Sequence, residues 1–273
     1  MSDTITLAPF ASEHLPAALA LSRAEAWPHR AEDWALLSSL SRGLVALADG
    51  RVEGTALLTR FGPVGLVNMI IVGEALRGRG LGRRLVEGLM AEADIPEYRL
   101  IATEAGLPLY RKLGFLETGR IRQHQGPVAP PPTAPVDWAR AADHAALSAL
   151  DRQATGMDRA PLIAALLRQG RVAVLREAGQ PIAWGAIRPF GRGQVAGPVI
   201  APDGTTARGL LSALMAGQEG QFLRVDVPED SGLSPWLETL GLAPVGGGVA
   251  MSTAPAPHAA PIRSFALAAQ ALG

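Results

Sequence analysis

Three short segments of this chain occur twice in the same order, and this repeat limits the possible folds more than any other feature. The offsets between the paired segments are all between 125 and 129 residues. The pairs are "NMIIV" and "GPVIA" (68–72 and 197–201), "RRLVEGLM" and "RGLLSALM" (83–90 and 208–215), and "LPLYRKLGF" and "LSPWLETLGL" (107–115 and 233–242). Similarity at a nearly constant offset indicates two copies of one structural unit.

A proline-rich stretch, "GPVAPPPTAPVDW", lies between the two copies. Its prolines stand at positions 127, 130, 131, 132 and 135. Proline fixes φ and has no N–H to donate, so this stretch predicts a stiff, extended linker. We therefore expect an N-terminal domain at 1–125, a linker at 126–137 and a C-terminal domain at 138–273.

Strand-like and helix-like spacings of apolar residues alternate along each copy. In the first copy the Asp49-Gly50 turn joins two apolar runs into a hairpin, and a near-continuous apolar strand and a helix near 82–93 follow it. The second copy repeats this order, with Ala178-Gly179 near its hairpin turn. The predicted fold class is α/β, with mixed strands and helices in two tandem units.

Charge and cysteine content exclude several functions. The formal net charge is +0, which argues against a nucleic-acid binder, and the chain contains no cysteine. Disulfides, thiol catalysis and thiolate metal sites are thereby excluded, and we assign no metal ligands. The first residues lack a basic region followed by an apolar run, and no apolar stretch of about 18 residues occurs. We expect a cytoplasmic protein without a signal peptide or membrane span.

The segment "RGRGLGRR" (77–84) stands directly before the helical pattern of the first copy. Glycine lets the backbone approach a ligand without an intervening Cβ, helix N-termini attract anions, and arginine binds phosphate through paired hydrogen bonds. The segment therefore predicts a diphosphate site, with a basic loop on a solvated face as the alternative. It matches neither the P-loop nor the G-x-G-x-x-G pattern of dinucleotide-binding folds.

The hexapeptide from Arg77 to Gly82 resembles the R/Q-x-x-G-x-G/A motif of the GCN5-related N-acetyltransferases (GNAT). The downstream string "YRLIATEAGLPLYRKLGF" resembles the second signature of that family, a strand and then a helix with a tyrosine just before Gly-Phe. The resemblance covers residues 3–124 and implies a mixed, mostly antiparallel sheet flanked by helices and splayed open at its central strand. Acetyl-CoA would bind in that gap. The whole chain resembles bacterial tandem GNAT proteins with a degenerate C-terminal copy.

The resemblance also assigns cofactor contacts residue by residue. The end of the central strand would pair with the pantetheine arm, and the loop and its arginines would hold the pyrophosphate. Thr103 stands where the family often has asparagine, so its contact with the cofactor arm is less certain. The implied residues are Ile70, Ile71, Val72, Arg77, Gly78, Arg79, Gly80, Leu81, Gly82, Arg83, Arg84 and Thr103.

The resemblance implies that Tyr110 is the general acid for the leaving thiolate; the alternative is a core aromatic residue. The base is not identified by any motif, and Glu25 and His29 are the catalytic candidates, with Trp27 lining the acceptor pocket. The alternative is a structural turn between two helices. Asp33 and Trp34 fit structural roles better, and we expect His124 to be a surface residue at a strand end.

The second copy lacks the cofactor signatures. "PDGTTARG" replaces the glycine-arginine string and Leu237 falls near the place of Tyr110, so we expect no second cofactor site. Asp158 and Arg159 lie in "LDRQATGMDRAPL". This loop either binds substrate and faces the first domain or is a helix–helix turn capped by Asp158, and both interpretations stay open.

These features favour an acetyl-CoA-dependent N-acyltransferase acting on a primary amine of a small molecule, peptide or protein. Direct attack in a ternary complex follows because no cysteine can form a thioester intermediate. The alternatives are a non-catalytic acyl-CoA sensor or interaction protein and a nucleotide-binding regulator that uses the same loop. We expect a monomer or homodimer that binds neither nucleic acid nor membrane.

Overall fold

The computed structural model describes residues 5–91, 94–133, 135–255 and 260–273. The N-terminal unit consists of β1 (Ile5–Pro9), α1 (Leu15–Ala24), α2 (Ala31–Leu40), β2 (Ser41–Ala48), β3 (Arg51–Phe61), β4 (Val64–Val72), α3 (Leu81–Ala91), β5 (Glu97–Ala102), α4 (Leu107–Lys112) and β6 (Leu116–Pro127). The C-terminal unit consists of β7 (Asp137–Trp138), α5 (His144–Thr155), α6 (Ala160–Gln169), β8 (Arg171–Glu177), β9 (Gln180–Phe190), β10 (Gly193–Ala201), α7 (Gly204–Met215), β11 (Phe222–Pro228), α8 (Ser234–Thr239), β12 (Ala243–Ser252) and β13 (Arg263–Ala266).

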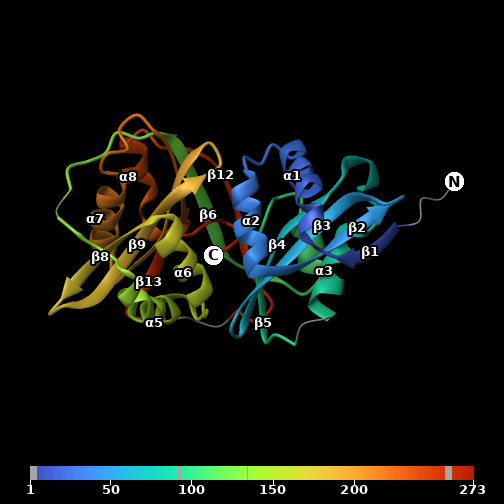
Figure 1. Cartoon of the computed structure of the whole chain (residues 1–273), viewed down its shortest axis with the longest axis horizontal. Helices are drawn as coiled ribbons and strands as arrows, with labels where there is room; N and C mark the ends of the chain where they lie inside the picture. Colours follow the sequence, from blue (N-terminus) through green and yellow to red (C-terminus); the bar gives the residue numbers. More distant parts are fainter. Residues whose placement is uncertain (1–4, 92–93, 134, 256–259) are drawn as a thin grey trace.

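The strands of both units form one continuous mixed sheet, mostly antiparallel (Figure 1). The strand order is β1-β2-β3-β4-β5-β12-β6-β11-β10-β9-β8-β7, and β13 pairs with β10 beside this path. The hairpins predicted at Asp49-Gly50 and Ala178-Gly179 join β2 to β3 and β8 to β9. The α/β class with a mixed, largely antiparallel sheet and flanking helices is therefore confirmed, and the two units share a single sheet.

The two units exchange their last long strands. β6 pairs with β11 of the C-terminal unit, while β12 lies between β5 and β6. Figure 1 shows β6 and β12 side by side in the middle of the molecule. This exchange explains why the prediction for His124 was wrong. The residue is fully buried, and its two ring nitrogens lie 3.1 Å from the Leu242 carbonyl oxygen and 3.0 Å from Ser234 Oγ.

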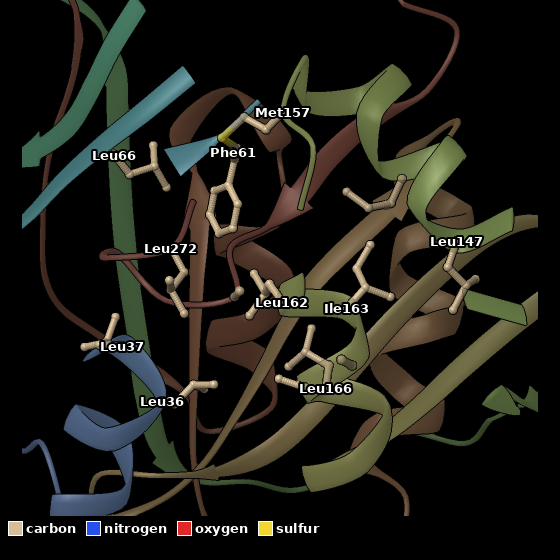
Figure 2. Packing of buried hydrophobic residues seen from close by; sticks show 14 of the residues in the cluster. Leu36, Leu37, Phe61, Leu66, Leu147, Met157, Leu162, Ile163, Leu166 and Leu272 are labelled. Carbon is tan, nitrogen blue, oxygen red and sulfur yellow. The ribbon is translucent and has the colours of Figure 1, made fainter. Parts of the chain in front are cut away.

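A hydrophobic core shared by both units lies beneath the sheet junction (Figure 2). Its N-terminal contribution comes from α2, β3 and β4, and its C-terminal contribution comes from α5, α6 and the end of the chain. The labelled members are Leu36, Leu37, Phe61, Leu66, Leu147, Met157, Leu162, Ile163, Leu166 and Leu272. Removal of this apolar surface from water holds the units in a fixed relative position.

The segment after β6 contains few regular elements. Gly126 and Pro127, which the sequence assigned to the linker, are the last residues of β6, and the described residues from 128 to 136 form neither helix nor strand. The division of the chain into domains stays a prediction. Within the described ranges, no helix combines the length and the apolar character that a membrane span requires.

Candidate active site

A gap opens in the sheet between β4 and β5. The two strands pair in parallel only at their beginnings, where Val64–Leu66 face Glu97–Arg99. Beyond these residues the structure describes no further pairing between β4 and β5. A cavity of about 280 Å³ is lined by residues of both strands, including Ile70 and Ile101. The splayed central strand expected from the sequence is therefore present, and it creates space next to the strand backbone.

A β-bulge in β4 forms part of the wall of this cavity. Ala56 of β3 faces two residues, Met69 and Ile70, and Met69 has a φ of 49°. The Thr55 hydroxyl donates a buried hydrogen bond of 2.8 Å to the Met69 carbonyl. A bulge redirects the backbone that carries it, so the Ile70 segment contributes main-chain groups to the gap.

The glycine-arginine loop lies at the end of β4 and leads into α3. Gly78 and Gly80 have φ values of 76° and 74°, and a Cβ at either position would meet no other atom within 4 Å. The first turn of α3 contains no acidic residue. The loop therefore combines open backbone with the positive end of a helix, which is the arrangement that binds phosphate.

The loop arginines are exposed and weakly engaged. Arg77 forms an ion pair with Glu25, and its Nε donates to the Val72 carbonyl at 3.2 Å. Arg83 forms a 2.8 Å pair with Glu87 one turn along α3. Exposed pairs of this kind are worth about 0–1 kcal/mol, so an entering phosphate can replace the carboxylates.

Tyr110 reaches the cavity from α4 and is only 7% exposed. Burial raises the pKa of its hydroxyl to about 12, and its ring packs edge-on against Phe115 with centroids 6.0 Å apart. Thr103 lines the same cavity, and its carbonyl accepts hydrogen bonds from the Gly106 and Leu107 N–H groups at the start of α4. The two predicted residues are thus brought to one side of the gap.

Trp27 and His29 line the cavity from the segment between α1 and α2. Burial lowers the pKa of His29 to about 4, with Asp33 opposing this shift and Arg224 and Arg188 adding to it. Its Nδ1 atom is buried and has no hydrogen-bond partner among the described residues. Glu25, the other predicted base, is not among the residues that line this cavity and is paired with Arg77 beside the loop.

The structure does not bring Asp158 and Arg159 into the cavity. The Arg159 side chain has no exposed surface, and its Nε and Nη2 bind the Asp151 carboxylate at 2.9 and 2.6 Å. We therefore assign Arg159 to the framework and not to substrate binding. Asp158 pairs with Arg152 at 3.0 Å, and its N–H donates to the Phe61 carbonyl, so its loop does contact the N-terminal unit.

Residues of the C-terminal unit complete the cavity, and sequence reasoning missed them. Phe190, Arg224 and Gln270 line it together with Gln123 of β6. Arg224 binds Asp226 through Nε and Nη2 at 2.8 and 3.1 Å. No local motif marks these residues, because they come from distant segments and meet only where the two units join.

In the C-terminal unit the gap between the corresponding strands is filled by protein. β10 and β11 pair in parallel only at Gln194–Val195 and Leu223–Arg224. Next to this pairing, β13 adds antiparallel to β10, and the Leu267 N–H donates to the Asp226 carbonyl at 2.9 Å. The chain itself therefore occupies this gap, and the absence of a second cofactor site stays a prediction.

Comparison with known proteins identifies both units. Family models described as Acetyltransferase (GNAT) domain match residues 39–117 and 147–264. The uncharacterized N-acetyltransferase YitH of Bacillus subtilis (strain 168) is 30% identical over 227 residues, which is 80% of each chain.

Two solved structures resemble the whole fold. A putative acetyltransferase from Pyrococcus horikoshii superimposes with a TM-score of 0.83 at 16% identity, covering 98% of this chain and 96% of the other. A GCN5-related N-acetyltransferase from Sphaerobacter thermophilus gives a TM-score of 0.60 at 16% identity, covering 91% and 95%. At these identities the likeness concerns the fold alone.

Proposed function

The chain belongs to the GNAT family of N-acetyltransferases, and from this premise we propose that it transfers an acetyl group from acetyl-CoA to a primary amine by direct attack in a ternary complex. One observation carries the proposal. Tyr110, His29 and the bulged Ile70 segment line a single cavity in the gap between β4 and β5, and β4 ends at the glycine-arginine loop.

The residues present fit acetyl-CoA. The open backbone at Gly78 and Gly80, the start of α3 and the exposed Arg77, Arg79 and Arg84 offer donors to the pyrophosphate and other phosphates. The end of β4 pairs with β3 on one side only, and its other side, which faces the gap, can bind the pantetheine arm as an added strand. Acetyl-CoA supplies the thioester carbonyl that is attacked and the thiolate that leaves.

Three groups of the chain then serve the transfer. The Ile70 segment would offer main-chain donors to the thioester carbonyl oxygen of bound acetyl-CoA. His29 is neutral at pH 7 because burial lowers its pKa to about 4, so its ring can position the amine through a hydrogen bond, although at this pKa it is a weak proton acceptor. Tyr110 stays protonated because its pKa is raised, and its hydroxyl donates to the departing sulfur.

The absence of cysteine supports direct transfer, since no thiol of the chain can carry the acetyl group. The acceptor must then occupy the cavity together with acetyl-CoA. The wall supplied by Phe190, Arg224 and Gln270 gives the C-terminal unit a part in acceptor binding.

The test measures free-thiol release from acetyl-CoA across a panel of amines. Tyr110→Phe should lower kcat about 100-fold or more while the Kd for CoA changes little, because the hydroxyl acts on the leaving sulfur. The matched control is Tyr98→Phe, which alters the other tyrosine, a residue of β5 whose hydroxyl donates to the Met90 carbonyl. Equal activity of Tyr110→Phe would remove the assigned donor. Stabilisation by CoA without thiol release on any amine would favour an acyl-CoA sensor.

A further inference from the structure

We propose that the acceptor amine carries a carboxylate, which binds at the end of the cavity formed by His29, Phe190 and Arg224. This inference rests on the proposed function and specifies its substrate class. It is carried by an excess of buried positive charge at the junction of the two units.

Among the described residues, three guanidinium groups and two buried carboxylates meet at the junction, while Glu32 beside Arg30 is exposed to solvent. Arg30 binds both oxygens of Asp33, through Nε at 3.1 Å and Nη2 at 2.9 Å. Arg224 binds both oxygens of Asp226, at 2.8 and 3.1 Å. Each carboxylate is therefore already matched by one guanidinium.

Arg188 is the third guanidinium and has no carboxylate of its own. The residue is 4% exposed, and its Nε atom has no hydrogen-bond partner in the part of the chain that the structure describes. Its ion pair with Asp33 is long, at 3.5 Å from Nη1 to Oδ1, and Asp33 is shared with Arg30. Burial lowers the pKa of Arg188 to about 10, so the group remains charged at pH 7. Its other contacts are with neutral groups, because Nη1 and Nη2 donate to the Pro189 and Ala268 carbonyls at 3.2 and 3.4 Å. A buried charge whose carboxylate is distant and shared is costly, and an anionic ligand nearby lowers that cost.

This charge lies directly behind the cavity wall. The guanidinium carbons of Arg188 and Arg224 are 5.1 and 5.2 Å from the centroid of the Phe190 ring, and Phe190 and Arg224 line the cavity. The His29 ring packs edge-on against Phe190 at 5.5 Å. The cavity wall formed by Phe190 and Arg224 therefore carries positive charge. Within the described residues, Arg224 Nη1 makes no hydrogen bond.

The size and charge of the site favour a small aminocarboxylate. The cavity of about 280 Å³ must also hold the acetyl end of acetyl-CoA in our proposal, so the space that remains suits only a small acceptor. The surplus of one positive charge matches a single carboxylate, whose two oxygens fit a guanidinium fork. With the carboxylate at Arg224, the amine is free to face Ile70 and Tyr110, where the acetyl group is to be transferred.

The test compares matched acceptors in thiol-release assays. Each amino acid is paired with its decarboxylated amine and with the corresponding aminoalkylphosphonate. We expect kcat/KM to be at least roughly tenfold higher for the carboxylate than for the decarboxylated amine. Equal or better turnover of the decarboxylated amines would overturn the proposal, and a consistent preference for the phosphonates would overturn the assignment of a carboxylate.

Two variants test which residues cause the preference for an acceptor with a carboxylate. Arg188→Met removes the guanidinium that has no carboxylate of its own and leaves the Arg30–Asp33 and Arg224–Asp226 pairs in place. The protein should therefore remain folded, while the ratio of kcat/KM between the carboxylate and the decarboxylated amine falls towards one. Arg224→Lys keeps the charge but removes the fork, and the preference should fall several-fold. The control is Arg192→Met, which alters an exposed arginine in the turn between β9 and β10 and should retain the preference. An unchanged preference in both Arg188→Met and Arg224→Lys would contradict the proposed binding site.

A binding experiment separates this inference from the proposed function. The CoA-bound protein is titrated calorimetrically with one amino acid and with its decarboxylated amine. If no amine releases thiol, the proposed function fails, but selective binding of the carboxylate would still support the anion site. Failure of both ligands to bind, or equal binding of the two, would overturn it.

Discussion

The two units begin their central helices differently, although both helices follow a bulged strand. In the N-terminal unit α3 follows Gly78 and Gly80 and is surrounded by arginines. In the C-terminal unit Asp203 caps α7, and its Oδ1 accepts a 2.7 Å hydrogen bond from the Thr206 N–H, which holds the pKa of Asp203 below its usual value. One unit thus leaves its helix start open to an anion, while the other supplies an anion of its own.

The same contrast holds for the gap in the sheet. Between β4 and β5 the N-terminal unit has a cavity, whereas between β10 and β11 the C-terminal unit has β13. In our proposal β13 occupies the place that the pantetheine arm takes in the first unit. The comparison teaches that the same gap in a GNAT unit can be left open, as between β4 and β5, or be filled by the chain itself, as between β10 and β11.

The largest effect is expected when an aspartate like Asp203, which caps α7, is placed at the start of α3. Gly80→Asp introduces a carboxylate where the phosphates should bind, and aspartate tolerates the positive φ of this position better than most residues. Because like charges brought together cost several kcal/mol, the Kd for CoA should rise at least about 100-fold in calorimetry. The reciprocal control, Asp203→Gly, should create no second CoA site because β13 still fills the gap. Unimpaired CoA binding by Gly80→Asp would remove the loop from the cofactor site.

The next effect concerns the strand that fills the second gap. A Cβ at Gly197 would lie 1.9 Å from the Leu267 carbonyl oxygen, just after β13. Gly197→Ala should therefore lower the free energy of unfolding by about 2–4 kcal/mol, measured by denaturant titration. Gly209→Ala in α7 meets nothing within 4 Å and should be neutral or raise stability by up to about 1 kcal/mol. Equal stability of the two variants would mean that β13 does not press against β10.

A smaller effect should appear in the pH dependence of stability. The pKa of His29 is about 4 in the folded protein against an ordinary value of 6.5, so between these values the unfolded chain binds the additional proton. Stability should therefore fall as the pH drops from 6.5 to 4, and His29→Gln should reduce that loss by roughly 2–3 kcal/mol. Thermal unfolding of both proteins across this range measures the difference. If the stabilities of the wild-type protein and His29→Gln changed equally with pH, His29 would not be held neutral at the junction.

The smallest effect is expected at the ion pair between Arg77 and Glu25. Glu25→Gln frees Arg77 for phosphate, and because an exposed pair contributes at most about 1 kcal/mol, the Kd for CoA should fall only about two- to fivefold. Calorimetry measures the change. A fall in kcat of about 100-fold in this variant would instead identify Glu25 as the base.

Local patterns were sufficient to predict the repeated units, both hairpins and the glycine-arginine loop. These features depend on residues that are close in sequence, such as the turn at Asp49-Gly50 or the glycines before α3. The motif that predicts Tyr110 and Thr103 is also local, and the structure brings both residues to one cavity.

Strand partners could not be predicted, because a period-two pattern shows that a strand has a buried face but not which strand lies beside it. For this reason His124 was assigned to the surface although β6 is an interior strand. The cluster of His29, Arg188 and Arg224 was missed for a related reason. Its members are far apart in the sequence and become neighbours only when α2 and the β9–β10 turn meet, where the Gly191 N–H donates to Asp33 at 3.0 Å.

The exchange of β6 and β12 has a consequence for how this protein is made. The inner neighbour of β5 is β12, which ends at Ser252, so a growing chain cannot complete this part of its sheet until residue 252 has left the ribosome. Until then β5 presents an open edge, which is the kind of surface that associates with other nascent chains. A stop codon before β12 therefore removes the strand that lies beside β5, and the activity that we propose for the N-terminal unit should be lost with it.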